Sequence, residues 1–480
     1  MRSLAVVAAL LCPAAALANG RPPLTKAVHF RPGDRHSIYA ATTFGLLVSH
    51  DDGCSFRWIC EQNIGYGGTF DPKYRIAADG TIFATTFTGL RVSRDGGCSF
   101  TTATADRPAG DPGRIAGIWI EAIDIGPTGE VWVATAESGR PNNLYRSTDS
   151  GVTFEPRGMR SRAIWWKSVV VAPSRARRIY ATGYQVAGVL ADGGSMPPTA
   201  HFEISDDGGE HWAESPLAGV QLGLTPLVYA LGVDRSNADV VFMASQAANP
   251  PTGDRLYRSS DGGRTWTEVL ATSGPILDLA IAPSGAAWVA TLGGGAFAST
   301  DHGATFAAMP HPPQLACIGQ IDGGPLLGCG ANWEPDGKAI ARSTDGVTWD
   351  KLFRFVELAG PVECPAGTPQ HDTCAAAWPN MQQQFGATGP TACSAQARRE
   401  VGADGASPPA TGAPPPKKAA GCCDAGEGSA GELAALALCA SVCAAATLRR
   451  RGRGRAAADR GQLGRAAAAS SASSPSRQLG

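Results

Sequence analysis

The chain has 480 residues, 43% of them hydrophobic, and its 41 basic and 42 acidic side chains leave a net charge of −1. This length and apolar content suffice for a large hydrophobic core. The near-zero charge gives no argument for binding nucleic acid or an anionic surface, so neither is expected as a partner.

Residues 1–18 have the features of a secretory signal peptide. Arg2 supplies a positive charge, an apolar stretch follows from Leu4 to Leu11, and a small-residue cleavage motif ends at Ala18. These are the three parts that a signal peptide requires. The mature chain is therefore expected to be exported.

A short motif, Ser-x-Asp-x-Gly-x-x-Phe or -Trp, recurs seven times, at spacings of about 40 to 58 residues, and its last copy is one residue shorter. A repeat of this length is typical of propellers and similar arrays. Each copy joins two strand-like runs, as a hairpin does. Its carboxylate is expected to accept backbone N–H groups of its own turn, and its glycine to adopt a positive φ. The repeated aspartates are Asp51, Asp95, Asp149, Asp207, Asp261, Asp301 and Asp345.

Four strand-like runs can be written for each repeat, with the motif joining the third run to the fourth. In the third repeat the first three runs are residues 118–125, 131–135 and 143–147. The sixth repeat begins with runs at 276–281 and 287–291. Seven such units predict an all-β fold, a seven-bladed β-propeller of four-stranded antiparallel blades, over residues 19–358.

The seven motifs resemble the Asp-box, or BNR, repeat of sialidases, sortilin-type receptors and photosystem assembly factors. The resemblance covers about residues 25–356 and implies that the motif is a structural hairpin at the blade periphery. It does not by itself imply an activity. Strand polarity places these hairpins, with the turns between first and second strands, on one face of the propeller, here called the box face. The remaining loops lie on the opposite face, called the loop face.

The loop face is predicted to carry the functional site because the long insertions fall there. Aligning the repeats places aromatic and charged side chains near the start of the innermost strands. Such a cluster suits stacking on a sugar or recognition of a peptide, and the alternative is that the tryptophans only fill space between blades. The predicted binding residues are Trp119, Glu121, Trp165, Trp166, Lys167 and Tyr229. The expected partner is a glycan, a peptide or a surface protein.

No catalytic residue and no cofactor are predicted. The sialidase resemblance implies an arginine in a Phe-Arg-Ile-Pro-like string, but the nearest string, Phe30-Arg31-Pro32, lacks the residue before proline and falls in a box-face turn. A pair of carboxylates from different blades would still permit glycan hydrolysis. A secreted glycoside hydrolase, sialidase-like or other, is therefore the alternative to a binding module.

Eight of the thirteen cysteines lie in or near the propeller. An even number in an exported chain suggests disulfides. Cys317 and Cys329 flank one turn symmetrically and are expected to pair, and Cys364 and Cys374 are expected to close a local loop. The scattered spacing predicts no zinc or other metal site. No pairing is assigned to Cys54, Cys60, Cys98 and Cys393.

The chain is expected to end in a surface-sorting tail. Residues 359–396 form a cysteine-containing extension, and residues 397–420 a Pro/Ala-rich linker that cannot bury a core. Within residues 421–455, Cys422 and Cys423 precede a short apolar run and an arginine cluster. This arrangement resembles the myxobacterial C-terminal sorting tail (MYXO-CTERM), which implies processing near the cysteines. A plain single-span anchor is the alternative, and residues 456–480 are expected to be disordered. The protein is thus expected at the cell surface or outer membrane, with or without release, and to meet the membrane only through this tail.

Overall fold

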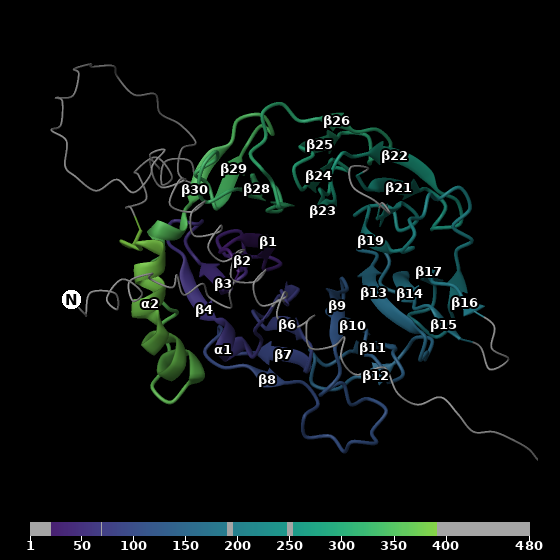
Figure 1. Cartoon of the computed structure of the whole chain (residues 1–480), viewed down its shortest axis with the longest axis horizontal. Coiled ribbons are helices and arrows are strands. Elements are labelled where there is room, and N and C mark those ends of the chain that lie inside the picture. Colours follow the sequence, from purple (N-terminus) through teal and green to yellow (C-terminus); the bar gives the residue numbers. More distant parts are fainter. Residues whose placement is uncertain (1–20, 69, 190–194, 247–252, 391–480) are drawn as a thin grey trace, which may run out of the picture. The chain divides into compact units, whose positions relative to one another are not determined.

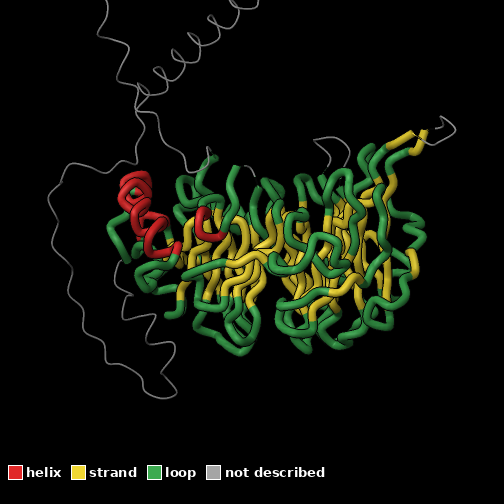
Figure 2. Tube along the Cα trace, turned by 90° about the horizontal axis from the view of Figure 1, so that it is seen from below, coloured by secondary structure: helices red, strands yellow, loops and turns green. Residues whose placement is uncertain are grey.

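The computed structural model describes residues 21–68, 70–189, 195–246 and 253–390, and all of them belong to one compact unit. Seven four-stranded antiparallel sheets follow one another along the chain and form a ring (Figure 1). The predicted seven-bladed β-propeller is confirmed. In side view the strands run across the thickness of the ring, with loops at both faces (Figure 2). The predicted signal peptide, Cys393 and the tail with Cys422 and Cys423 lie outside the described residues.

Each blade is built from four consecutive main strands, and the first lies innermost. Blades 1 and 2 contain β1 (Thr25–Phe30), β2 (Ile38–Thr42), β3 (Gly45–Ser49), β4 (Arg57–Cys60), β5 (Tyr74–Ile76), β6 (Ile82–Thr86), β7 (Gly89–Ser93) and β8 (Thr101–Thr102). Blades 3 and 4 contain β9 (Ile120–Ile125), β10 (Val131–Thr135), β11 (Leu144–Ser147), β12 (Glu155–Pro156), β13 (Ile164–Val171), β14 (Ile179–Gln185), β17 (Thr199–Ser205) and β18 (Ala213–Glu214). Blades 5 and 6 contain β19 (Val228–Val233), β20 (Val241–Ser245), β21 (Arg255–Ser259), β22 (Thr267–Ala271), β23 (Ile276–Ile281), β24 (Ala287–Thr291), β25 (Ala296–Ser299) and β26 (Ala307–Ala308). Blade 7 contains β27 (Cys317–Gln320), β28 (Leu326–Cys329), β29 (Ile340–Ser343) and β30 (Asp350–Phe353).

Few elements lie outside the blades. The insertion of blade 4 forms a small hairpin of β15 (Gly188–Val189) and β16 (Ser195–Met196). The helical segments are α1 (Glu61–Ile64), the short turns η2 (Phe355–Glu357) and η3 (Gln370–Cys374), and α2 (Ala375–Phe385). Among the described residues, no helix has the length and apolar character needed to cross a membrane.

The hydrophobic core is divided among the blade interfaces. Seven clusters of buried side chains occur in the described residues, and each combines two neighbouring blades. The second strands are mostly buried. In β10 every residue is buried, and Trp132 packs toward blade 4 while Val133 packs toward blade 2. Burial of this apolar surface is the main stabilising term of the ring.

The repeated motif forms the hairpin between the third and fourth strands. In blade 6, Asp301 accepts bonds from Ser299 Oγ (2.7 Å), Thr305 N (3.0 Å) and Thr305 Oγ1 (2.6 Å). Gly303 has φ +70°, and a Cβ there would lie 2.3 Å from the Phe242 ring of blade 5. Glycine is therefore required for the turn and also for close approach to the preceding blade.

The extension after blade 7 continues around the ring onto blades 1 and 2. Pro361 forms a bridge with Trp58 of β4, and Gln370 donates to the Trp58 carbonyl over 2.6 Å. Helix α2 then packs on the core shared by blades 7 and 1 through Met381 and Phe385. Figure 1 shows α2 beside β4 and close to the end of blade 7. The extension therefore covers the place where the ring closes.

Disulfides fix this extension, and they correct one predicted pair. Cys374 is bonded to Cys60 of β4, and Cys364 to Cys98 of blade 2. The predicted Cys364–Cys374 bond is wrong, because the extension is stretched over two blades and each cysteine faces a blade cysteine.

The local pair is present as expected. Cys317 and Cys329 lie opposite each other on β27 and β28 and are bonded. Cys54 is disulfide-bonded as well. Such bonds are typical of an oxidising compartment, which indicates an extracellular protein.

Candidate functional site on the loop face

The innermost strands place charged side chains around the propeller axis by means of β-bulges. In β1, β9 and β13 the pairing with the second strand skips one residue, and the skipped residues are Lys26, Glu121 and Lys167. A bulge releases a residue from the ladder and re-aims its side chain. The equivalent residue of β23 is Leu277, which is 40% exposed although it lies on an innermost strand. Solvent therefore reaches the axis at this level.

The predicted pair Glu121 and Lys167 meets across blades 3 and 4. Lys167 Nζ lies 3.0 Å from Glu121 Oε1, and Lys73 Nζ, just before β5, lies 3.6 Å from the same oxygen. Burial first, and then the charge of Lys167 together with that of Arg75, lower the pKa of Lys73, while Glu121 acts in the opposite direction. Two ammonium groups thus share one carboxylate, which leaves local positive charge at this end of the axis.

Four aromatic rings continue from this charged group along the loop face, and we call them the aromatic row: Phe70, Phe87, Trp119 and Trp165. Ring centroids are 4.4 Å apart for Phe70–Phe87, 4.9 Å for Phe87–Trp119 and 6.1 Å for Trp119–Trp165. Lys167 Nζ lies 5.6 Å from the Trp119 ring centre, within cation–π range. Phe87, in the turn between β6 and β7, is 48% exposed. Exposed aromatic side chains that lie together are typical of a contact surface.

Sequence reasoning missed Phe70, Phe87 and Lys73. The two phenylalanines lie in loops of blades 1 and 2, and only their position in loop-face connections would have marked them. Lys73 precedes β5, which is only three residues long and so gives a poor anchor for aligning repeats.

Two predicted binding residues, Trp166 and Tyr229, are placed differently from the expectation. Trp166 is completely buried in the core between blades 3 and 4, because successive strand residues point to opposite faces and its side chain lies on the face opposite to that of Trp165. Tyr229 is not a bulge residue, since β19 skips Leu231 instead. It is half-buried, and burial, followed by the Glu121 and Asp254 carboxylates, raises its pKa to about 12.

Further along the innermost strands, after the bulges of β9 and β23, carboxylates connect neighbouring blades. Asp124 pairs with Arg75 of blade 2 (3.0 Å) and accepts the Val171 N–H of blade 4 (2.9 Å). Asp278 accepts the Ile318 N–H of blade 7 (3.1 Å) in the same manner. Burial raises the pKa of Asp278 to about 6, although its hydrogen bonds and the Arg75 charge act in the opposite direction. Both carboxylates are therefore engaged in holding blades together.

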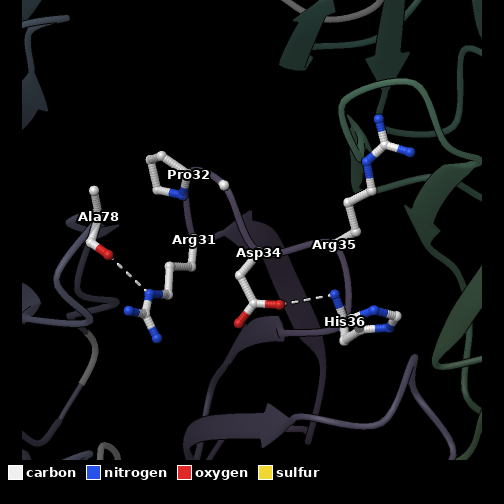
Figure 3. Close-up of a pocket in the computed structure, with 7 residues that line it drawn as sticks. Arg31, Pro32, Asp34, Arg35, His36 and Ala78 are labelled. Atoms are coloured by element: carbon white, nitrogen blue, oxygen red, sulfur yellow. Dashed lines mark hydrogen bonds between the residues drawn. The ribbon is translucent and has the colours of Figure 1, made fainter.

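A hollow on the box face contains the string that the sialidase resemblance singles out. It is lined by residues 31–36 and Ala78. Arg31 Nε donates to the Ala78 carbonyl over 3.0 Å. The side chain of Arg35 extends from the turn in the opposite direction to that of Arg31 (Figure 3). Asp34 accepts the His36 N–H over 2.9 Å. Because the two guanidinium groups point away from each other, they form no joint clamp for a carboxylate.

No known protein-family model matches this chain. A stretch of 157 residues is 29% identical to xyloglucanase Xgh74A of Acetivibrio thermocellus, covering 30% of this chain and 16% of the enzyme. The structure is similar to an ancestral GH74 enzyme (TM-score 0.50, 14% identity, 69% of this chain and 46% of that one). It is also similar to YCF48 from Cyanidioschyzon merolae (TM-score 0.42, 13% identity, 65% and 94%). This chain thus spans 16% of the xyloglucanase and 46% of the ancestral GH74 enzyme. At 14% identity, the likeness to the ancestral enzyme shows the fold alone.

Proposed function

We propose that this protein is an exported binding module that holds a glycan or peptide chain on its loop face. The observation that carries the proposal is the aromatic row, which joins an exposed phenylalanine to a Lys–Glu–Lys group through ring contacts. Aromatic faces stack on sugar rings or apolar side chains, and the adjacent charges fix orientation by hydrogen bonds. The expected surface anchoring through the tail with Cys422 and Cys423 is part of this proposal.

Calorimetric titration with soluble polysaccharides, sialosides and peptides tests the proposal. A ligand that binds the loop face should lose about tenfold in affinity, about 1.4 kcal/mol, in Phe87→Ala and in Trp165→Ala. Trp333→Ala is the matched control, since Trp333 is 49% exposed and lies outside the row. Equal losses in the control and the row variants would contradict a site at the aromatic row.

Glycan hydrolysis is the second candidate, and the match to a xyloglucanase supports it. Two candidate carboxylates lie at the axis, where Asp278 has a raised pKa and Asp124 is paired with Arg75. A proton donor and an ionised partner are what glycoside hydrolysis requires. The commitment of both groups to blade-to-blade bonds is the reason that we prefer the binding module. Release of reducing ends from xyloglucan, lost in Asp278→Asn with unchanged folding, would establish the enzyme instead.

A further inference from the structure

Blade 4 contains a group of metal-ligating side chains away from the loop-face site. His201 and Glu203 lie two residues apart on β17 and therefore point to the same side of the sheet. Glu214, on the outer strand β18, is the direct cross-strand partner of Glu203. One ligand atom from each of the three side chains lies within 4.8 Å of the other two.

The burial of Glu203 is the first sign that a ligand belongs here. Glu203 is only 2% exposed, yet no hydrogen bond or ion pair reaches its carboxylate from the described residues. A buried carboxylate without a donor or counter-ion is strongly unfavourable. The polypeptide therefore supplies a negative group and no positive charge to match it.

The imidazole of His201 gives a second sign. Its Nδ1 lies 2.8 Å from Glu214 Oε1, while its Nε2 is buried and has no partner. When Nδ1 carries the proton and donates to the carboxylate, Nε2 has a free lone pair that only a donor or a cation can satisfy. The unpartnered nitrogen of His201 and the unpartnered carboxylate of Glu203 thus belong to two side chains on the same side of β17.

We infer that His201, Glu203 and Glu214 form a binding site for a divalent transition-metal ion of the zinc type. One imidazole and two carboxylates are ligands that zinc accepts, and they would neutralise its two positive charges. Ligand atoms at about 2.1 Å from one ion lie at most about 4.2 Å apart, so the cluster must close slightly. Glu214 can make this movement, since its side chain is 55% exposed. The ion would tie the two-residue strand β18 to β17.

Zinc titration of the full-length protein, stripped with EDTA and kept without reductant, tests the site. One equivalent should bind with a Kd below about 10 μM and should raise the melting temperature. Glu203→Gln and Glu214→Gln should each weaken binding at least tenfold, and the second change, at an exposed position, should leave the fold intact. His36→Gln is the matched control, because His36 contacts Asp52 over 2.9 Å but has no third ligand; it should bind zinc as the unchanged protein does.

Two results would overturn the inference. The first is wild-type-like zinc binding by both glutamine variants, which would place the ion elsewhere. The second is no zinc binding by the unchanged protein, which would mean that the cluster needs no metal.

Discussion

The hairpin aspartates and Asp278 at the axis have opposite pKa shifts. In the hairpins, hydroxyl and backbone N–H donors surround the carboxylate and lower its pKa, to about 2 for Asp261 and Asp345 although burial opposes this in both. At the axis, burial outweighs the hydrogen bonds of Asp278 and raises its pKa to about 6. The same side chain therefore stabilises the fold in its ionised form at the surface and in its protonated form at the axis.

The raised pKa of Asp278 predicts a pH-dependent effect of Asp278→Asn. The folded protein holds this proton more tightly than the unfolded chain, so the carboxyl favours folding below pH 4 and this contribution is lost as the pH rises through 6. The free energy of unfolding of the asparagine variant should improve relative to the unchanged protein by on the order of 2 kcal/mol between pH 4 and pH 8. Urea unfolding at several pH values measures this difference. A difference that stays constant with pH would show that Asp278 is ionised in the folded state.

Single residues also show where prediction from the sequence stops. Trp165, Trp166 and Lys167 are consecutive, and aligning repeats could not tell which side chain faces the core. The strand alternation decides this, but the bulge at Lys167 shifts the alternation by one residue. The bulge is a property of the paired strands and has no mark in the sequence. For the same reason, aligning the repeats matched Tyr229 with the bulge residues Glu121 and Lys167, although the bulge residue of β19 is Leu231.

At the scale of elements, the extension after blade 7 shows why its disulfide pairs could not be predicted from the sequence. Cys364 and Cys374 are close in sequence, and a local loop was the simplest expectation. Their actual partners, Cys98 and Cys60, are 266 and 314 residues away. The end of blade 7 lies next to blade 1 only because the ring closes. These two disulfides could therefore be assigned only from the three-dimensional structure. The Cys317–Cys329 bond could be predicted because one hairpin contains both residues.

The two long-range disulfides are expected to stabilise the ring more than the local one does. Closing a loop of hundreds of residues removes more unfolded-state entropy than closing one of about 12, for which the chain-entropy estimate is about 3 kcal/mol. Replacing both pairs, Cys60/Cys374 and Cys98/Cys364, by alanine should therefore lower the melting temperature further than replacing Cys317 and Cys329. Thermal unfolding without reductant measures both losses. Equal losses per bond would mean that the extension holds the ring closed mainly by its packing and hydrogen bonds.

At the scale of the whole molecule, the repeat made the architecture predictable. The strands expected at residues 131–135, 276–281 and 287–291 are β10, β23 and β24 with the same bounds. These strands have regular bounds because each blade packs against its two neighbouring blades in the same way. The candidate site is the part in which the blades differ, and it therefore depends on loops and bulges that the repeat does not specify. The fold could therefore be predicted from the repeat, whereas the candidate site could be predicted only in part.

The sevenfold repetition also predicts a common response to acid. Hydrogen bonds lower the pKa of all seven hairpin aspartates in the folded state. Their stabilising contribution is present above the unfolded pKa, about 3.8, and is lost as the pH falls toward the lower folded values. The urea midpoint should therefore fall steeply between pH 4 and pH 2. Asp301→Asn should make this fall less steep, because one fewer carboxyl takes up a proton on unfolding. Asp278→Asn is the control below about pH 3, where its carboxyl is protonated in both the folded and the unfolded state. In that range it should leave the steepness unchanged, and the reverse order of the two variants would refute the role assigned to the hairpins.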